Sequence, residues 1–367
     1  MKGAAKEQQS FRVALQHRIA DFLGLNVEER AVVCVTSGTN ALRAALKVAI
    51  GPHRSSTRNE VIVPAFAALP TAEAVLMEGF VPIIVDVDPD TWLLSPEATA
   101  KALSASTAAI VTVDWLGTLC DLRPFRQLAD EHGIPLISDS AQSFGANGSG
   151  RPPADEYADA FIYSTSFPKV FHTGGSGGIV ICSKADAEWL YEEPTGFLRR
   201  DAMPEVNAYL GLRALDGLPQ SLEIRRRAAE TYRKHLGSVP GIAFQDITGA
   251  LATNHYQMSV VIDEEQFGVD AKALCLALQA ENIHCSIDRM RCLGAIPRLL
   301  RGCEVAGDLP VSRKLGKASL TLPIFNSLTP EACRKICHCI QAIHDKSGVA
   351  AVDRREVERP SLLAHDQ

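Results

Sequence analysis

Residues 31–50 read AVVCVTSGTNALRAALKVAI, and this stretch indicates the fold class. The apolar run AVVCV is typical of a buried strand, and the segment after Gly38 has the apolar spacing of a helix. Short apolar runs alternate with helical segments over the first two thirds of the chain. Strands that are apolar on both faces and alternate with helices form a parallel sheet with helices on both sides. The sequence therefore predicts an α/β fold.

Further strands and helices follow on either side of this stretch. We expect strands over 61–64, 81–88, 108–115, 134–140, 160–164 and 177–183. We expect helices over 71–79, from Pro96 onward and over 122–133, where Gly133 ends the last one. Because ligands of such sheets bind at the carboxyl ends of the strands, the loops after these strands are the candidate site.

The pattern changes after about residue 200. It predicts helices over 207–218 and 221–236, then a smaller α+β unit. That unit combines strands over 258–263, 284–288 and 318–325 with helices over 269–282 and 329–343. We expect a large domain over 1–225, a small domain over 226–345 and a polar, disordered tail over 346–367.

Composition excludes several classes of protein. The 367 residues include 37 Lys and Arg against 43 Asp and Glu, so the net charge of −6 argues against nucleic-acid binding. We expect no membrane partner, because no run approaches the roughly 18 apolar residues of a spanning helix. The 10 Cys are scattered and many lie in apolar runs, which favours free thiols in the cytoplasm. We expect no metal, since Cys333 and Cys337 are spaced as neighbours on one helix.

Three loops after predicted strands carry polar side chains. Thr36-Ser37-Gly38-Thr39-Asn40 combines glycine, hydroxyls and a helix start, which suits a phosphate; it could equally be a helix cap. Asp139 ends an apolar strand and could bind a ligand or cap the next segment. Lys169 follows another strand and could be a surface charge or a desolvated amine for covalent chemistry. Together, in this order, the three are the parts that a pyridoxal phosphate enzyme needs.

At this point the sequence resembles the DegT/StrS-type aminotransferases, a fold type I pyridoxal phosphate family that acts largely on keto-sugars. The resemblance spans about residues 11–345, and its strongest stretches include TSGTNALRAAL, the run from VDWLGTLCDL to LISDSAQSFGA, STSFPKVFHTGGSGGIV and LTLPIFNSLTPE. It implies a large domain with a mostly parallel seven-stranded sheet between helices, plus the smaller C-terminal α+β domain. It also implies a homodimer with shared active sites.

The resemblance assigns roles by position. Lys169 matches the Schiff-base lysine, and Asp139 matches the partner of the pyridine nitrogen. Gln142 resembles the glutamine beside the ring hydroxyl of the cofactor. The phosphate binders implied by the resemblance are Gly38, Thr39 and Ser164.

Two departures from the family pattern lie near the cofactor. Ala68 stands where the family usually has an aromatic residue stacked on the pyridine ring. Arg200 stands where a partner subunit usually offers Asn to the phosphate. Arg200 is either a solvated surface residue or a cofactor-binding residue that reaches across the dimer, where its guanidinium would hold the phosphate more strongly than an amide.

The leading functional interpretation is an aminotransferase of a biosynthetic pathway. It would move an amino group from an amino-acid donor, usually glutamate in this family, to a keto-sugar, either free or nucleotide-linked. The alternative is another pyridoxal phosphate reaction, such as epimerisation, elimination or transamination, on a small metabolite that is not a sugar. A third interpretation is a protein that has the fold of these enzymes but no catalytic activity. The presence of both Lys169 and Asp139 argues against this third interpretation.

Overall fold

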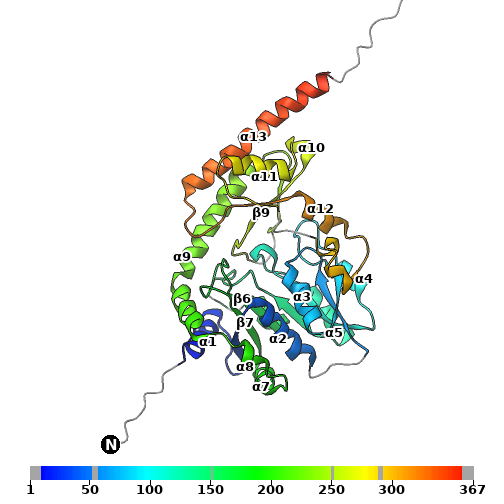
Figure 1. The fold of residues 1–367 in the computed structure, drawn as a ribbon, viewed down its shortest axis with the longest axis vertical. Coiled ribbons are helices and arrows are strands. Elements are labelled where there is room, and N and C mark those ends of the chain that lie inside the picture. The colour runs from blue at the N-terminus through cyan, green and yellow to red at the C-terminus, as the bar shows by residue number, and fades with distance from the viewer. Residues whose placement is uncertain are drawn as a thin grey trace, which may run out of the picture.

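The structure, a computed structural model, describes residues 10–51, 57–148, 150, 152–248, 252–287 and 292–357, with side chains described as far as residue 347. Figure 1 shows a larger lower unit built on a sheet and a smaller upper unit that contains α10, α11 and α13. The long helix α9 (Glu205–Leu236) runs beside both units. The described part of the chain therefore has two packed units joined by a shared helix.

The large sheet has eight strands in the order β1-β7-β6-β5-β4-β2-β3-β10. Their bounds are β1 Arg30–Val35, β2 Glu60–Pro64, β3 Val81–Val85, β4 Thr107–Val113, β5 Leu136–Asp139, β6 Ala160–Ser164, β7 Gly178–Ser183 and β10 Glu304–Val305. Strand β7 runs antiparallel to both its neighbours, and the other pairs are parallel. The seven strands predicted from the sequence are all present and the predicted fold class is confirmed, but the expected seven-stranded sheet has an eighth strand, β10, which comes from far downstream in the chain.

Helices cover this sheet. They are α1 Phe11–Leu23, α2 Gly38–Ile50, α3 Leu69–Met77, α4 Pro96–Ala102, α5 Arg123–His132, α6 Pro153–Tyr157, α7 Lys184–Glu192, α8 Phe197–Asp201 and α12 Pro310–Ala318. Helix α4 begins at Pro96 as predicted, with the Ser95 hydroxyl accepting from the Ala98 N–H. Helix α5 ends at Gly133, which adopts the left-handed conformation at φ 58°. Local sequence signals thus set these helix ends.

The sheet forms the centre of the larger core. Every residue of β4 (TAAIVTV) and of β6 (AFIYS) is buried, which requires cover on both faces. The core also includes Cys292, Leu293, Leu299 and Leu309 from far downstream. That return segment adds β10 beside β3, and the Asp86 carboxylate accepts from the backbone N–H groups of the first turn of α12. The predicted small domain over 226–345 is therefore interrupted by a segment that belongs to the larger unit.

The two helices predicted over 207–218 and 221–236 are one continuous helix, α9, with Pro219 inside it. A proline in a helix interior costs about 3 kcal/mol because it removes a backbone hydrogen bond and crowds the preceding turn. Packing of α9 against α1 at one end and α13 at the other offsets that cost. The predicted boundary at residue 225 falls within this helix.

The smaller unit has a three-stranded sheet in the order β11-β9-β8. Its elements are β8 Ile242–Phe244, β9 Met258–Ile262, β11 Ser319–Leu322, α10 Glu264–Phe267, α11 Ala271–Ala280 and α13 Pro330–Val357. Within the described residues 284–287, the strand predicted over 284–288 is present as one bridge, from Ser286 to Thr321, and residue 288 lies outside the described residues. Residues 346–357, predicted as part of a disordered tail, continue α13 as helix. Residues 358–367 lie outside the described residues.

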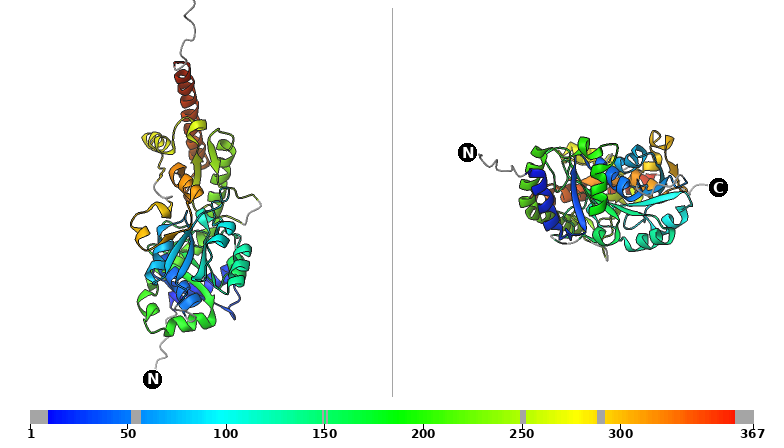
Figure 2. Two further views of the ribbon diagram at one scale, coloured as in Figure 1. Left: turned by 90° about the vertical axis from the view of Figure 1, so that its right-hand side faces the viewer. Right: turned by 90° about the horizontal axis from the view of Figure 1, so that it is seen from below.

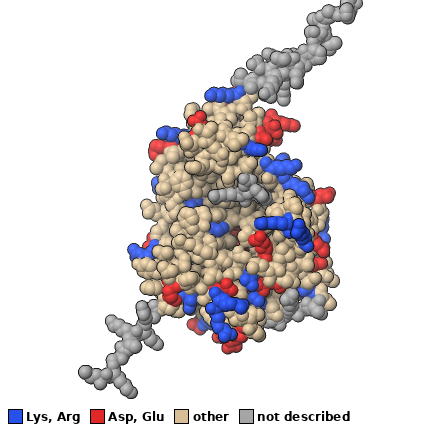
Figure 3. Space-filling model, viewed as in Figure 1, with Lys and Arg blue, Asp and Glu red and all other residues tan. Residues whose placement is uncertain are grey.

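The molecule is elongated. Figure 2 shows α13 projecting from the smaller unit, at the opposite end of the molecule from α1. On the face drawn in Figure 3, basic and acidic side chains are interspersed. Among the described residues, none of the helices has the length and apolarity needed to cross a membrane.

Candidate active site

Strands β1, β5 and β6 end at the same edge of the large sheet. Gly178, at the start of β7, pairs with Val35 at the end of β1 and with Ser164 at the end of β6. Asp139 ends the adjacent strand β5 and pairs with Ile162 of β6. Strand pairing therefore brings the three predicted loops to one place, although they are far apart in the sequence.

The predicted phosphate loop contacts the end of β6. A methyl group added at Gly38 would lie 2.6 Å from the Cβ of Ser164, so a side chain at this position would displace the end of β6. The Ser37 hydroxyl caps α2 by accepting from the Asn40 N–H at 3.1 Å. Thr39 lies half-buried in the first turn of the same helix. The helix start and the Ser164 hydroxyl together offer the donors that a phosphate needs.

Asp139 is buried at the end of β5. Its Oδ2 accepts from the Thr71 hydroxyl at 2.8 Å, and its Oδ1 accepts from the Ala141 N–H at 3.2 Å. Burial raises the pKa of Asp139 above its ordinary value, and the positive charge of Lys169 partly opposes this. A cationic N–H placed beside this carboxylate would stabilise its ionised form.

Lys169 lies in the loop after β6, with its backbone N–H donating to the Ser166 carbonyl at 2.9 Å. Its Nζ lies 4.3 Å from the ring centroid of Tyr256. Burial lowers the pKa of Lys169 from 10.5 to about 8, while the charge of Asp139 acts in the opposite direction. A sizeable fraction of the amine is therefore neutral near pH 8, which is the form that attacks an aldehyde.

Gln142 follows Asp139 in the loop after β5 and is buried. Its Oε1 accepts from the Leu116 N–H at 2.9 Å, which fixes the orientation of its amide. The amide nitrogen can then donate to an oxygen in the site. The backbone carbonyl of Gln142 accepts from Asn254 Nδ2 at 2.8 Å, which ties this loop to the smaller unit.

A second buried carboxylate, Asp114, follows β4 beside Asp139. It accepts from the Cys120 N–H at 2.9 Å and from the Ser143 hydroxyl at 2.6 Å, so it joins the loops after β4 and β5. Burial raises the pKa of Asp114 to about 6. This residue supports the loop that carries Gln142.

The two departures from the family pattern have different surroundings. Ala68 is half-buried just before the start of α3. The nearby Phe66 is fully buried, with its ring packed edge-on against Trp115 at 5.6 Å, so it serves the core. Arg200 is exposed on α8, next to Asp201, whose carbonyl accepts from the Thr36 N–H at 2.8 Å. Arg200 is thus at the surface, one residue from the segment that contacts the phosphate loop.

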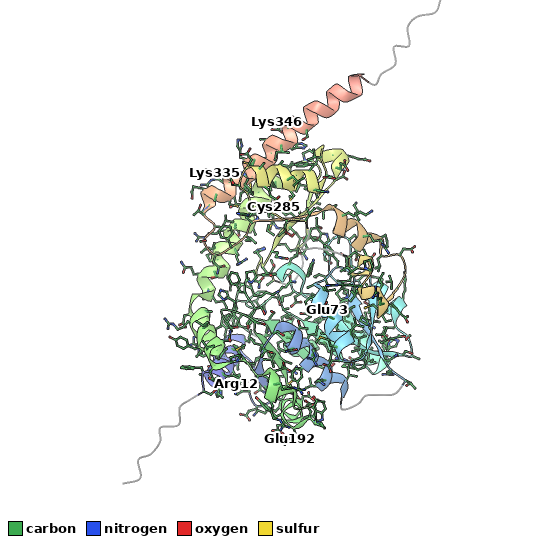
Figure 4. The ribbon with its side chains drawn as sticks, viewed as in Figure 1. Arg12, Glu73, Glu192, Cys285, Lys335 and Lys346 are labelled. Carbon is green, nitrogen blue, oxygen red and sulfur yellow. The ribbon has the colours of Figure 1, made fainter. Side chains whose placement is uncertain are left out.

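A cavity of about 360 Å³ lies between the Lys169 loop and the smaller unit. Its lining combines polar and apolar side chains, among them Pro168, Arg225, Tyr256, His284, Cys285 and Thr321. Cys285 is labelled in Figure 4, where it lies below α11 on the side facing the large sheet. The cavity therefore adjoins the Lys169 loop on the side of the smaller unit.

These residues fit pyridoxal phosphate. The cofactor has a dianionic phosphate, a ring nitrogen that takes a proton and an aldehyde, and the site offers a helix start, a buried carboxylate and a desolvated amine. The buried Asp139 carboxylate suits this cofactor, because a protonated ring nitrogen beside it would offset the cost of burying a charged group.

Sequence reasoning missed four residues of this arrangement: Thr71, Asp114, Asn254 and Tyr256. Asp114 is the second-to-last residue of the predicted strand over 108–115, so the rule that placed Asp139 could have found it. Thr71 lies in the first turn of the helix after β2, so the rule that ligands bind after strand ends also applies to it. Asn254 and Tyr256 come from a downstream loop with no local signal.

Comparison with known proteins places the chain among aminotransferases. Residues 7–341 match the DegT/DnrJ/EryC1/StrS aminotransferase family. The chain is 37% identical over 338 residues to the UDP-2-acetamido-2-deoxy-3-oxo-D-glucuronate aminotransferase of Pseudomonas aeruginosa, which covers 88% of each chain. It is 29% identical over 362 residues to the UDP-N-acetyl-3-dehydro-alpha-D-glucosamine 3-aminotransferase of Acidithiobacillus ferrooxidans, which covers 92% of this chain and 91% of that one.

A solved structure has the same fold. The crystal structure of DesI in the presence of its TDP-sugar product superimposes with a TM-score of 0.79 at 26% identity, covering 94% of this chain and 87% of DesI. The similarity therefore extends over both units.

Proposed function

This chain belongs to the DegT/DnrJ/EryC1/StrS aminotransferase family, and from that premise we propose that it transfers an amino group from glutamate to the keto group of a nucleotide-linked sugar. The main observation behind the proposal is that Lys169, Asp139 and the closely packed pair Gly38 and Ser164 all lie at one edge of the sheet. An enzyme of this kind catalyses a step in the biosynthesis of an amino sugar.

Each site residue has a distinct task in this reaction. When bound, pyridoxal phosphate supplies an aldehyde that carries the amino group and a ring that withdraws electrons from the substrate carbon. The α2 start and Ser164 would bind the phosphate. Asp139 would hold a proton on the ring nitrogen. Lys169 would hold the cofactor covalently through its aldehyde group, and the free amine of Lys169 would carry a proton between carbon atoms.

The named relatives narrow the substrate class. The two curated relatives described above act, by their names, on a UDP-linked 2-acetamido sugar with a keto group at carbon 3. We propose the same class for this chain, because the identity extends along most of both chains. The cavity beside Tyr256 has a volume suited to a sugar ring and part of its nucleotide.

The homodimer and the cytoplasmic location are further parts of the proposal. Apolar side chains are exposed together on α1 and α9, with Phe11 and Tyr209 in edge-on contact at 5.2 Å and Val206 66% exposed. A second copy of the chain would cover this surface. In such a dimer, Arg200 would reach the phosphate of the neighbouring site.

The visible spectrum of the purified protein tests the proposal. We expect absorbance from a tightly held cofactor that changes when L-glutamate is added, with one 2-oxoglutarate released per site. Addition of a UDP-linked 3-keto-sugar should then restore the first spectrum and yield an amino sugar. A UDP-linked 4-keto-sugar is the matched comparison for the position of the keto group.

The outcomes separate the parts of the proposal. Failure to hold pyridoxal phosphate would contradict the cofactor assignment. A spectral change without 2-oxoglutarate would favour another reaction of the same cofactor. Restoration by the 4-keto-sugar alone would keep the aminotransferase and overturn the substrate class.

A further inference from the structure

A loop of the smaller unit enters the active site between β8 and β9. Asn254 in this loop is buried and donates from Nδ2 to the backbone carbonyls of Gln142 at 2.8 Å and Phe144 at 3.0 Å. Gly117 approaches so closely that an added methyl group would lie 1.9 Å from Asn254 Oδ1. The loop is therefore held tightly against the segments that follow β4 and β5.

A buried arginine holds the next part of the loop. Arg225, on α9, donates from Nη1 to the Tyr256 carbonyl at 3.0 Å and to the His255 carbonyl at 3.4 Å. Burial lowers the pKa of Arg225 to about 10, a sign of how far its charge is removed from water. His255 adopts a left-handed φ of 50°, which is unfavourable for a residue with a side chain. The buried Arg225 charge and the left-handed backbone of His255 are both energetically unfavourable, and both help to fix the position of Tyr256.

The result of this arrangement is the position of the Tyr256 ring. Its centroid lies 4.3 Å from Lys169 Nζ, within the range of a cation–π interaction. The Asn254 Oδ1 accepts from the Tyr256 N–H at 2.9 Å, so the backbone of the tyrosine is fixed on both sides. The charge that acts on the Lys169 amine is that of the Asp139 carboxylate, and the Tyr256 contribution is the ring that the amine lies over.

We propose that Tyr256 is a positioning residue whose ring supports the Lys169 amine whenever that amine is not bonded to the cofactor. The inference rests on the proposed aminotransferase reaction, in which the lysine is released and must bond again in every cycle. A free lysine has a long, flexible stem, and the ring restricts where its amine can go. The ring also favours the ammonium form, which is the form that delivers a proton.

Capture of pyridoxal phosphate by the cofactor-free full-length protein tests the proposal without any substrate. The rate, followed by visible absorbance, should rise with pH through the pKa of Lys169, near 8 in the wild type. Tyr256→Leu keeps an apolar side chain but removes the π face, so the pKa should fall by about half a unit to one unit. Tyr256→Phe keeps the ring and should leave the profile unchanged. Tyr191→Leu, on the exposed surface of α7, controls for loss of a tyrosine.

Turnover gives a second readout. With L-glutamate as donor, Tyr256→Leu should lower kcat about tenfold with little change in KM, and Tyr256→Phe should stay within about threefold of the wild type. Equal pH profiles for the wild type and Tyr256→Leu would overturn the proposal, as would Tyr256→Phe behaving like Tyr256→Leu. If the wild type fails to capture the cofactor at all, the proposed function fails instead, so the two failures are distinguishable.

Discussion

The two ends of the active site are built in different ways. The phosphate end consists of Gly38, which begins α2 shortly after β1, and Ser164, which ends β6, and the two residues are closely packed. At the amine end, Lys169 comes from the large sheet, but Tyr256 comes from the smaller unit. The first end depends on strand pairing and on the start of α2, all within the larger unit, whereas the second requires the two units to pack correctly. We therefore expect substitutions at the two ends to affect different properties of the enzyme.

Lys169→Ala is expected to have the largest effect, because it removes the covalent bond to the cofactor and the proton carrier together. Turnover should be abolished, and the visible absorbance that survives dialysis should disappear. Lys184→Ala, which changes a partly exposed lysine at the start of α7, is the matched control. An unaltered spectrum in Lys169→Ala would show that another lysine bonds the cofactor.

Asp139→Asn lies between the two ends and should reduce turnover about 100-fold or more while the fold is kept. An amide of the same shape can still accept from Thr71, but it cannot hold a proton on the ring nitrogen electrostatically. Steady-state kinetics with L-glutamate measure the effect, with Asp130→Asn on the exposed face of α5 as control. Activity close to that of the wild type would show that Asp139 has only a structural role.

Gly38→Ala tests the phosphate end. The added methyl group meets the Ser164 Cβ at 2.6 Å, so the affinity for pyridoxal phosphate should fall about 30-fold, equivalent to about 2 kcal/mol. Equilibrium titration of the cofactor-free protein measures this, and Gly217→Ala, where an added methyl group meets nothing within 4 Å, is the control. If turnover falls but affinity does not, the two ends are not separable as we describe.

Arg200→Ala tests whether Arg200 from a second copy of the chain binds the cofactor phosphate. If Arg200 binds the phosphate across the dimer, cofactor affinity should fall about tenfold, and the difference should shrink at high salt. The neighbouring Arg199→Ala is the matched control. An unchanged affinity in Arg200→Ala would leave this residue as surface charge, consistent with its exposure in the single chain.

Asn254→Ala tests the amine end from the side of the smaller unit and should have the smallest effect on the chemistry. It removes two hydrogen bonds that join the units, so we expect the free energy of unfolding to fall by about 1–3 kcal/mol. Turnover should fall a few fold, while cofactor affinity should change less than in Gly38→Ala. Chemical denaturation and cofactor titration of the same samples provide the comparison. A loss of affinity as large as that of Gly38→Ala would contradict the separation of the two ends.

Prediction from sequence succeeded where the signal is local. The apolar runs located all seven strands of the first two thirds, and Pro96 and Gly133 marked helix ends. It was less successful where packing overrides a local signal. The two helices expected over 207–218 and 221–236 are the single helix α9, which packing at both ends stabilises. The return segment that adds β10 carries too short an apolar run to be recognised as part of the large sheet.

The amino-acid sequence alone determined the α/β class and the placing of Gly38, Asp139, Ser164 and Lys169 after strands, because strand periodicity and glycine turns act over a few residues. Only the tertiary structure placed Tyr256 against Lys169 and Asn254 against the loop of Gln142. These contacts depend on how two units pack around α9, and nothing within a few residues of Tyr256 specifies which surface its ring will meet. The desolvation that lowers the pKa of Lys169 has the same origin, since burial is a property of the assembled fold and not of the local chain.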